Sequence, residues 1–302
     1  LTTTPTRMTI ADRDSAARID RIGLVGYGEV GQALAQMFLA AGVGVSVLTR
    51  SPERLRESLT DESIGVADSH RSLAEETELV ISCVWPETAV TVAEQVAPGL
   101  ADGQPYLDLN SIAPETTDRI VSVIDEAGGT PLTAAIMGSA AAGGNDVRLV
   151  LAGSDSEATV EILSSVGLAV EDAGDDPERP AAIKMFRSMF TKGLRQLAAE
   201  TLAPAAAYGL HEEVLADLSG LFAERPVDEW LRDALENTPE HAERRLGELR
   251  EVRTTVSDPG FRAPTLEESI KLHKCLAETK ARSDGYLAVL HALDPHLKRE
   301  GR

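Results

Sequence analysis

Short apolar runs alternate with amphipathic segments through the first 176 residues. Segments such as Glu87–Ala97 and Ala113–Glu126 repeat apolar residues at helical spacing, whereas the runs between the helical segments have the length and composition of buried strands. This alternation predicts right-handed βαβ units and therefore a doubly wound, mostly parallel α/β sheet. The expected strands are Arg21–Val25, Val43–Leu48, Leu79–Val84, Tyr106–Leu109, Pro131–Met137, Val147–Leu151 and Leu168–Glu171.

The alternation of strands and helices stops at residues 175–177. The sequence that follows predicts only helices, interrupted at prolines because proline lacks the N–H that continues a helix. We therefore expect a tail over residues 1–20, an α/β domain over 21–176 and an all-helical second domain over 177–302. The expected interruptions are at Pro204, Pro226, Pro239, Pro259, Pro264 and Pro295.

The first helix of the second domain is expected over residues 181–203 and has two distinct faces. One face is apolar and is expected to pack into a core; it carries Ile183, Phe186, Phe190, Leu194 and Leu197. A narrow polar sector lies well away from that face, and it meets either solvent or a ligand. Its members are Lys184, Ser188, Thr191 and Arg195.

Three glycines in the spacing G-x-G-x-x-G follow the first expected strand, where a helix begins. Gly26 permits a tight turn, Gly28 lets the backbone approach a pyrophosphate, and Gly31 lets the helix pack closely on its strand. Free N–H groups at the helix start would then face the phosphates. This context predicts a Rossmann dinucleotide site. The cofactor-binding residues expected here are Gly26, Tyr27, Gly28, Glu29, Val30 and Gly31.

The end of the second strand favours NADP over NAD. An NAD site usually places a carboxylate about twenty residues beyond the glycine turn, to bind the ribose hydroxyl. Here the first carboxylate is Glu53, and Arg50 occupies the region, with Thr49 and Ser51 beside it as further hydrogen-bonding groups. An arginine suits the 2′-phosphate of NADP. Alternatively, Arg50 is a surface residue before a helix that Ser51 caps and Pro52 opens.

Other candidate residues lie at strand ends, because ligands of doubly wound sheets bind at the carboxyl ends of the strands. Val84 and Trp85 follow the third expected strand, and Asn110 and Ser111 follow the fourth. We assign all four to cofactor binding and place Ser111 near the substrate as well. Ser111 also fits a turn or a helix cap.

A loop of small residues follows the fifth expected strand and contains Met137, Gly138 and Ser139. Backbone N–H groups exposed in such a loop bind anions without a charged side chain. We therefore assign these three residues to substrate binding. A close-packed turn is the alternative interpretation.

Lys184 is the first lysine of the chain, because residues 1–183 contain none. If the chemistry requires a lysine, the second domain must supply it. Lys184 follows the last expected strand by about a dozen residues, so its helix is expected to start beside the cofactor cleft. On the same polar sector, Ser188 is expected to orient a substrate. Lys192 would hold an anionic tail unless it is simply solvated.

Composition excludes several classes of protein. A net charge of −20 argues against nucleic acid or an anionic membrane as a partner, since both require a basic surface. No apolar run approaches the roughly 20 residues that span a bilayer, and the first twenty residues do not resemble a signal peptide. Two cysteines are too few for a disulfide framework, which suits the cytoplasm. The histidines lack the spacing of a helical metal site, so no metal is expected.

Taken in order, four segments resemble the β-hydroxyacid dehydrogenases, which include 3-hydroxyisobutyrate and 6-phosphogluconate dehydrogenases. The similarity covers roughly residues 20–200. The later part is similar to a poorly characterised branch in which Lys-Met-x-Arg-Ser and Thr-Lys-Gly-Leu recur on one helix. The segments are Gly26–Gly31, Leu107–Pro114, the loop around Ile136–Gly138, and Lys184–Ser188.

The resemblance implies a Rossmann domain, a helical second domain through which two subunits pair, and Lys184 as the catalytic general acid/base. Two departures affect the substrate. Better-known members carry Ser-Gly-Gly where this chain has residues 137–139, and they carry Asn or His-Asn where it has Ser188. The resemblance therefore supports hydride chemistry more firmly than a carboxylate substrate.

These observations predict an NADP-dependent oxidoreductase that transfers a hydride between NADP(H) and a small, anionic hydroxy or keto compound. The alternative enzyme is an imine reductase, although related imine reductases generally lack a lysine at the position of Lys184. A decarboxylating sugar-phosphate dehydrogenase is disfavoured because the second domain is short. A redox sensor that binds NADP without turnover is the alternative outside enzymes.

Overall fold

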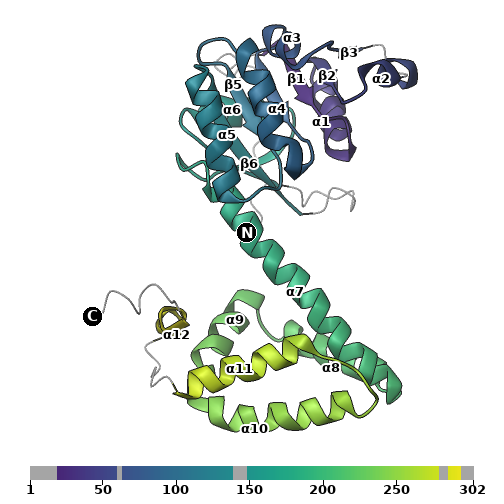
Figure 1. Cartoon of the computed structure of the whole chain (residues 1–302), viewed down its shortest axis with the longest axis vertical. Coiled ribbons are helices and arrows are strands. Elements are labelled where there is room, and N and C mark those ends of the chain that lie inside the picture. The colour runs from purple at the N-terminus through teal and green to yellow at the C-terminus, as the bar shows by residue number, and fades with distance from the viewer. Residues whose placement is uncertain (1–18, 60–62, 139–147, 279–284, 294–302) are drawn as a thin grey trace, which may run out of the picture. The chain divides into compact units, whose positions relative to one another are not determined.

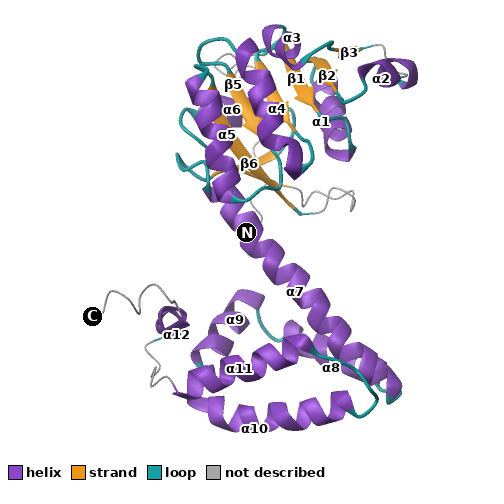
Figure 2. Ribbon diagram, in the orientation of Figure 1, coloured by secondary structure: helices purple, strands orange, loops and turns teal. Residues whose placement is uncertain are grey.

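The computed structural model describes residues 19–59, 63–138, 148–278 and 285–293 (Figure 1). The chain divides into two compact units, Leu1–Met189 and Phe190–Arg302. We call the first the sheet unit and the second the helical unit. Strands occur only in the sheet unit among the described residues, and the described elements of the helical unit are all helices (Figure 2).

Eight strands in the described part of the sheet unit form one sheet, in the order β3-β2-β1-β4-β5-β6-β7-β8. Neighbouring strands are parallel except for β6 and β7, which are antiparallel. The order reverses between β1 and β4, and a crevice forms at such a point. The strands are β1 Arg21–Val25, β2 Gly44–Leu48, β3 Ile64–Val66, β4 Leu79–Ser82, β5 Pro105–Asp108, β6 Thr130–Met137, β7 Arg148–Ala152 and β8 Ala169–Asp172.

Helices cover both faces of this sheet. On one face, Phe38 of α1 and Leu163 of α6 join the apolar cluster around Leu24. On the other, α3, α4 and α5 pack against Val80 and Tyr106. Burial on both faces explains why the strands are almost continuously apolar. The helices are α1 Glu29–Ala40, α2 Pro52–Ser58, α3 His70–Glu75, α4 Ala89–Val96, α5 Pro114–Glu126 and α6 Ser156–Ser165, with short 3₁₀ helices η2 Pro86–Thr88 and η3 Ala97–Gly99.

The α/β class, with a mostly parallel Rossmann-like sheet followed by a helical region, is confirmed. Each expected strand overlaps an observed one. The strand β3 is absent from the expectation because it has only three residues, one of them Gly65, and therefore leaves too short a pattern.

The helix α7, Arg179–Ala207, differs from the expectation in two ways. Pro204 lies inside α7 and does not end it: the helix lacks the backbone hydrogen bond from residue 204 to the carbonyl of Glu200 and still continues to Ala207. The apolar face expected to enter a core is exposed: Phe186 is 73% exposed, and the other four residues are also exposed. A single chain therefore leaves an unusual apolar stripe in contact with solvent.

The helical unit has a small apolar core and one buried polar cap. Ala242, Leu276 and Val289 are the buried residues of the core. Its other helices are α8 His211–Ala223, α9 Val227–Glu236, α10 Thr238–Ser257, α11 Pro264–Glu278 and α12 Tyr286–Leu293.

The cap is Glu200, a buried residue of α7 that holds the N-terminus of α11. Its two carboxylate oxygens accept from the Thr265 backbone N–H at 3.2 and 3.0 Å, and one also accepts from the Thr265 hydroxyl at 2.9 Å. A carboxylate suits this position because the first N–H groups of a helix lack intrahelical partners. Burial raises the pKa of Glu200, but hydrogen bonds from Gln196 and Thr265 outweigh burial and lower it overall.

Candidate functional site

A cavity of about 380 Å³ opens at the carboxyl ends of β4, β5 and β6, and all of its lining belongs to the sheet unit. Residues from α1, from the loops after β4 and β5, and from α7 contribute to the wall. The position agrees with the rule that ligands of doubly wound sheets bind where the strand order reverses. The lining residues are Val30, Cys83, Val84, Pro86, Leu109, Asn110, Ser111, Ile136, Gly138, Lys184, Arg187 and Ser188.

The three glycines of the turn have different surroundings. Gly26 has a φ of +102°, and a Cβ there would collide with the Cys83 carbonyl oxygen. A Cβ on Gly31 would collide with the Gly26 carbonyl oxygen, so α1 is pressed against the turn. A Cβ on Gly28 would meet no protein atom within 4 Å. Two glycines therefore allow the turn to fold, and the third leaves its outer side open.

Gly28, the glycine with open space around it, immediately precedes α1. Gly28 is the N-cap residue and provides no side-chain hydrogen bond to the first N–H groups of the helix. Unpaired N–H groups at a helix start favour phosphate. The next turn of α1 places Val30 in the cavity wall. This arrangement fits the pyrophosphate of a dinucleotide, with Glu29 exposed beside it and Tyr27 partly buried against the core.

At the end of β2, Arg50 is exposed, and the Ser51 N–H donates to the Thr49 hydroxyl at 3.3 Å. Ser51 precedes α2, but its side chain makes no capping bond. No ion pair joins Arg50 to a carboxylate among the described residues. Arg50 therefore remains available to a phosphate.

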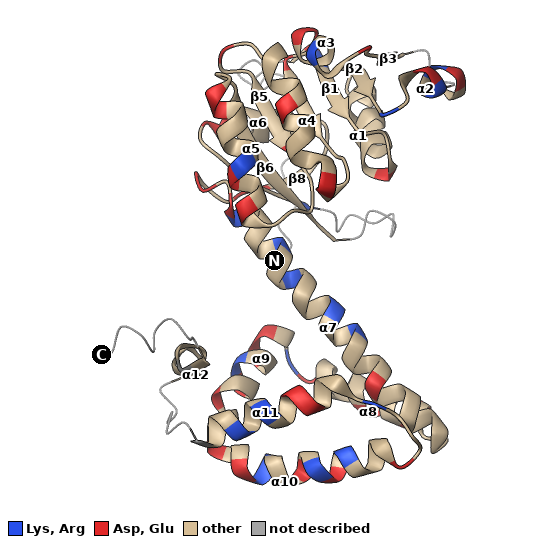
Figure 3. Ribbon diagram, viewed as in Figure 1, with Lys and Arg blue, Asp and Glu red and all other residues tan. Residues whose placement is uncertain are grey.

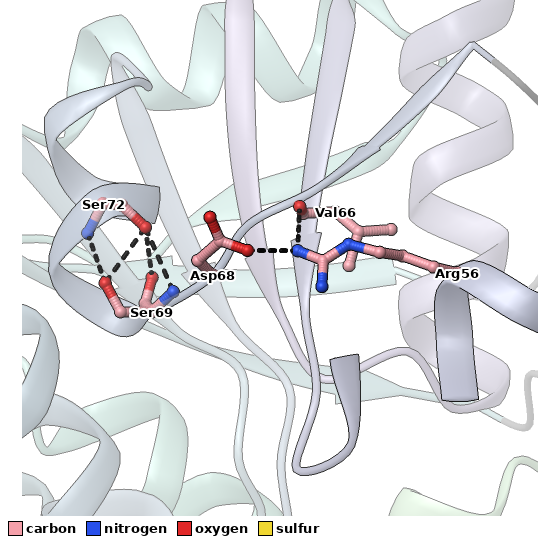
Figure 4. A network of polar contacts seen from close by, with 5 residues as sticks. All are labelled: Arg56, Val66, Asp68, Ser69 and Ser72. Atoms are coloured by element: carbon pink, nitrogen blue, oxygen red, sulfur yellow. Dashed lines mark hydrogen bonds and ion pairs between the residues drawn. The ribbon is translucent and has the colours of Figure 1, made fainter. Parts of the chain in front are cut away.

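The neighbouring Arg56 is not available in the same way. Its guanidinium donates to the Val66 carbonyl at 3.0 Å and pairs with Asp68 (Figure 4). Asp68 immediately precedes Ser69, and Ser69 and Ser72 form a capping box at the start of α3. Arg56 thus joins α2 to the segment after β3.

Asn110 ties together the ends of β4 and β5. Its side-chain carbonyl accepts from the Val84 N–H at 2.7 Å, and its amide nitrogen donates to the Ser82 hydroxyl at 3.1 Å. The same nitrogen donates to Asp108. The structure brings Asn110 to the cavity, but its side-chain oxygen and nitrogen already form hydrogen bonds within the protein. Ser111, next to it, is exposed and also lines the cavity.

The helix α7 contributes Lys184, Arg187 and Ser188 to the cavity, and Figure 3 shows basic residues spaced along this helix. Burial lowers the pKa of Lys184; Asp108 raises it and Arg187 lowers it further, so that the pKa lies below the ordinary lysine value. The beginning of α7 is fixed to the sheet because the Thr133 hydroxyl of β6 donates to the Pro177 carbonyl at 2.5 Å. A lowered pKa favours the neutral amine, the form that can accept a proton.

The sequence analysis did not identify two residues at this site, Arg187 and Asp108. Arg187 lies on the helix one turn after Lys184, a spacing that places both on one side. Asp108 ends β5 and is 3% exposed. Burial raises its pKa to about 7, against the lowering effects of Asn110 and Lys184. A single carboxylate within the apolar segment Tyr106–Leu109 is the signal that points to it.

Some expected residues are not brought to the cavity. Trp85 is 69% exposed and is not part of the wall. Met137 is buried with Ala135 and Val150, because alternate residues of β6 face opposite ways and Ile136 faces the cavity instead. Lys192 is exposed, two turns beyond Lys184 and outside the lining. Ser139 lies outside the described residues.

Cys83 lies between the glycine turn and the cavity. Its thiol donates to the Gly26 carbonyl at 3.3 Å, and burial, with a smaller contribution from Asp108, raises its pKa to about 12. The side chain is therefore a neutral thiol that supports the turn. Within the described ranges no group of three or more His, Cys, Asp or Glu side chains is placed to bind a metal, and no helix is long and apolar enough to cross a bilayer.

Comparison with known proteins agrees with the fold and indicates that the sheet unit binds a nucleotide. Residues 21–170 match the NAD-binding domain of 6-phosphogluconate dehydrogenase, and residues 205–281 match a domain of unknown function. An uncharacterized 28.5 kDa protein of Methanothermus fervidus is 27% identical over 78% of this chain and 90% of its own length.

Two solved structures extend the comparison. A conserved protein of unknown function, described as structurally similar to 3-hydroxyacid dehydrogenases, is 32% identical; the match covers 85% of this chain and 96% of that one, with a TM-score of 0.56. An imine reductase from Aspergillus terreus, in complex with NADPH4 and dibenz[c,e]azepine, is 17% identical over 90% and 99% of the two chains, with a TM-score of 0.76. The second likeness concerns the fold alone.

The glycine turn predicts opposite results for two alanine substitutions. Gly28→Ala places a methyl group in open space and should leave the melting temperature within a few degrees of the wild-type value while raising the Kd for NAD(P)H at least tenfold. Gly31→Ala forces the methyl group into the Gly26 carbonyl and should destabilise the fold by about 1–3 kcal/mol. Thermal unfolding and fluorescence titration measure the two effects. Unchanged cofactor binding in folded Gly28→Ala would contradict the assignment of the turn.

Proposed function

Because the chain belongs to the β-hydroxyacid dehydrogenase-like superfamily and is an NAD(P)-dependent dehydrogenase or reductase, we propose that it transfers a hydride between NADP(H) and a small anionic hydroxy or keto compound. Residues 21–176 would bind the cofactor, and residues 177–302 would supply the catalytic lysine and the contacts between subunits. The observation that carries the proposal is the presence of Lys184 and the glycine-turn residue Val30 in the wall of one cavity.

Lys184 would act as the general acid and base. When bound, NADP(H) supplies or accepts the hydride at the reacting carbon. In reduction, the Lys184 ammonium gives a proton to the carbonyl oxygen as it becomes an alkoxide; in oxidation, the neutral amine takes the hydroxyl proton. Burial lowers the pKa of Lys184, which favours the neutral form that oxidation requires. Ser188, one turn further along α7, would orient the substrate by a hydrogen bond.

The charges of the cavity wall support an anionic substrate. The wall contains the cations Lys184 and Arg187, whereas none of its described lining residues is a carboxylate. This local excess of positive charge occurs in a chain whose net charge is −20. A guanidinium is well suited to bind a carboxylate by two parallel hydrogen bonds. Arg187 is therefore a stronger candidate than Lys192 for holding the anionic group.

NADP is the proposed cofactor because Arg50 is exposed and has no ion-pair partner among the described residues. An arginine at the end of the second strand is the feature that accommodates a 2′-phosphate. The imine reductase from Aspergillus terreus, which shares the fold, has NADPH4 bound. Thr49 and Ser51 would add hydrogen bonds to the same phosphate.

A homodimer is proposed from the apolar stripe of α7. Ile183, Phe186 and Phe190 are exposed on one side of this helix, as are Leu194 and Leu197 further along it. Exposed apolar side chains at helical spacing favour association with a second copy. A subunit interface would bury the face that the sequence pattern assigns to a core.

An imine reductase is the second candidate, since proteins of that activity share this fold. A C=N substrate requires the same hydride and one proton, so Lys184 would serve either reaction. A sensor that binds NADP without turnover would carry the glycine turn but transfer no hydride. A panel of substrates distinguishes the three possibilities.

The first prediction of the proposed function concerns Lys184. With NADPH and a panel of small oxo acids, neutral ketones and aldehydes, and cyclic imines, Lys184→Met should lower kcat/KM by at least about 100-fold, because general acid catalysis is lost. NADPH oxidation at 340 nm gives the rate, and Lys274→Met on α11 is the control. Full activity in Lys184→Met would disprove the lysine mechanism. Preference for imines would select the second candidate, and cofactor binding without turnover would select the sensor.

The second prediction concerns cofactor choice. Arg50→Gln should raise the Kd for NADPH about 10- to 100-fold, the loss expected for a charge-assisted contact, while changing the Kd for NADH by no more than about twofold. Arg119→Gln on α5 provides a matched change of charge away from β2. An equal effect on both cofactors would remove Arg50 from the 2′-phosphate site. Fluorescence titration measures both constants.

The third prediction concerns the dimer. In light scattering at about 10 µM, the wild-type protein should have the mass of two chains, and Leu194→Asp with Leu197→Asp should have the mass of one. The charges would be buried without partners in an interface and are tolerated on an exposed helix. A wild-type mass of one chain at this concentration would exclude the proposed pairing.

A further inference from the structure

Asp108 is a buried carboxylate that has no role in the hydride transfer described above. It ends β5, where the strand register places it beside Ser82 of β4 and Thr133 of β6. It is 3% exposed, and charged residues are rarely buried without a specific reason. The cavity wall begins one residue further, at Leu109.

The hydrogen bonds of Asp108 are one-sided. Its Oδ1 accepts from the backbone N–H of Asn110 at 3.0 Å and from the side-chain amide of the same residue. Its Oδ2 accepts no hydrogen bond from the residues that the structure describes. One oxygen therefore fixes Asn110 in the cavity wall, and the other leaves the negative charge only partly compensated.

Four ionisable groups face this part of the site. Cys83 and Tyr106 are buried, and burial raises the pKa of each, so both are neutral at physiological pH. On α7, Lys184 and Arg187 carry the nearby positive charges, and Arg187 opposes protonation of Lys184. Asp108, a fifth ionisable group, favours the ammonium form of Lys184.

We propose that Asp108 is a positioning residue that keeps Lys184 protonated beside the substrate and holds Asn110 in the cavity wall. This role rests on the proposed function of the same site. In reduction, the Lys184 ammonium gives its proton to the alkoxide oxygen, and the neutral amine is reprotonated from solvent. Above its pKa of about 7, Asp108 carries the negative charge that favours the ammonium form. Without the Asp108 charge, the amine would hold its proton less firmly because burial and Arg187 both disfavour the ammonium form.

Asp108→Asn tests the charge while keeping the shape. The new amide oxygen can still accept from Asn110, but the negative charge is lost, so the pKa of Lys184 should fall by about one to two units. The high-pH decline of reduction should therefore move to lower pH by that amount. The low-pH rise of oxidation should move in the same direction, because the neutral amine forms earlier. A merely structural defect would lower the rates without moving either limb.

Labelling of Lys184 by trace acetic anhydride provides a readout that needs no turnover. The full-length protein is labelled across a range of pH, and mass spectrometry follows the peptide containing Lys184, whose labelling rate rises with the neutral fraction of the amine. The midpoint should be about one to two units lower in Asp108→Asn. The control is Asp172→Asn, which neutralises another strand-end carboxylate outside the cavity and should leave the midpoint unchanged.

An unchanged midpoint in folded Asp108→Asn would overturn the inference, whether or not the protein transfers hydride. If hydride transfer is absent but the midpoint moves, the proposed function fails and the electrostatic pairing stands. If Asp108→Asn does not fold, the reciprocal measurement replaces it. The carboxyl titration of ¹³C-labelled Asp108 should move to higher pH in Lys184→Met, and the absence of that shift would also overturn the inference.

Discussion

The close contact between α1 and the turn after β1 is the constraint on which the rest of the site depends. Gly31 lies against the Gly26 carbonyl, and Gly26 lies against the backbone of Cys83, so that no side chain separates the first helix from the ends of β1 and β4. The Asn110 side chain continues the connection from Val84 to β5. The carboxyl ends of three parallel strands are thus held together by backbone contacts and one buried amide.

Charge is distributed unevenly around this centre. The chain as a whole is strongly acidic, yet the described cavity wall presents Lys184 and Arg187, and Asp108, one residue before Leu109 of the wall, is buried and bonded to Asn110. Two cations on one helix repel each other, and a buried negative charge on the neighbouring strand offsets that repulsion. The cavity wall is therefore more positive than the chain as a whole, and the pKa of its lysine lies below the ordinary value.

Local patterns predicted the features that depend on neighbouring residues. The glycine spacing, the overlapping strands and the helical second region follow from periodicity and backbone sterics, which act over a few residues. The antiparallel pairing of β7 with β6 depends on contacts between distant segments, so no local pattern specifies it. The burial of Asp108 leaves only a weak local signal, a single carboxylate within an apolar strand. The exposure of Phe186 was missed for a related reason, because an apolar helical face indicates burial without identifying what covers it. The strand pattern led to Met137 as a substrate-binding residue, whereas Ile136 lines the cavity. Neighbouring residues of a strand point to opposite faces, so an error of one position changes the face.

The hydrogen bond from Thr133 to the Pro177 carbonyl has a mechanical consequence for the chemistry. Lys184 lies five residues beyond the start of α7, about 7.5 Å along the helix axis. A change in the direction of the helix at its start therefore displaces the amine. A tilt of about 10° at the base would move the amine by roughly 1 Å, enough to change a rate substantially. The position of the proposed catalytic amine therefore depends partly on a backbone carbonyl outside the cavity wall.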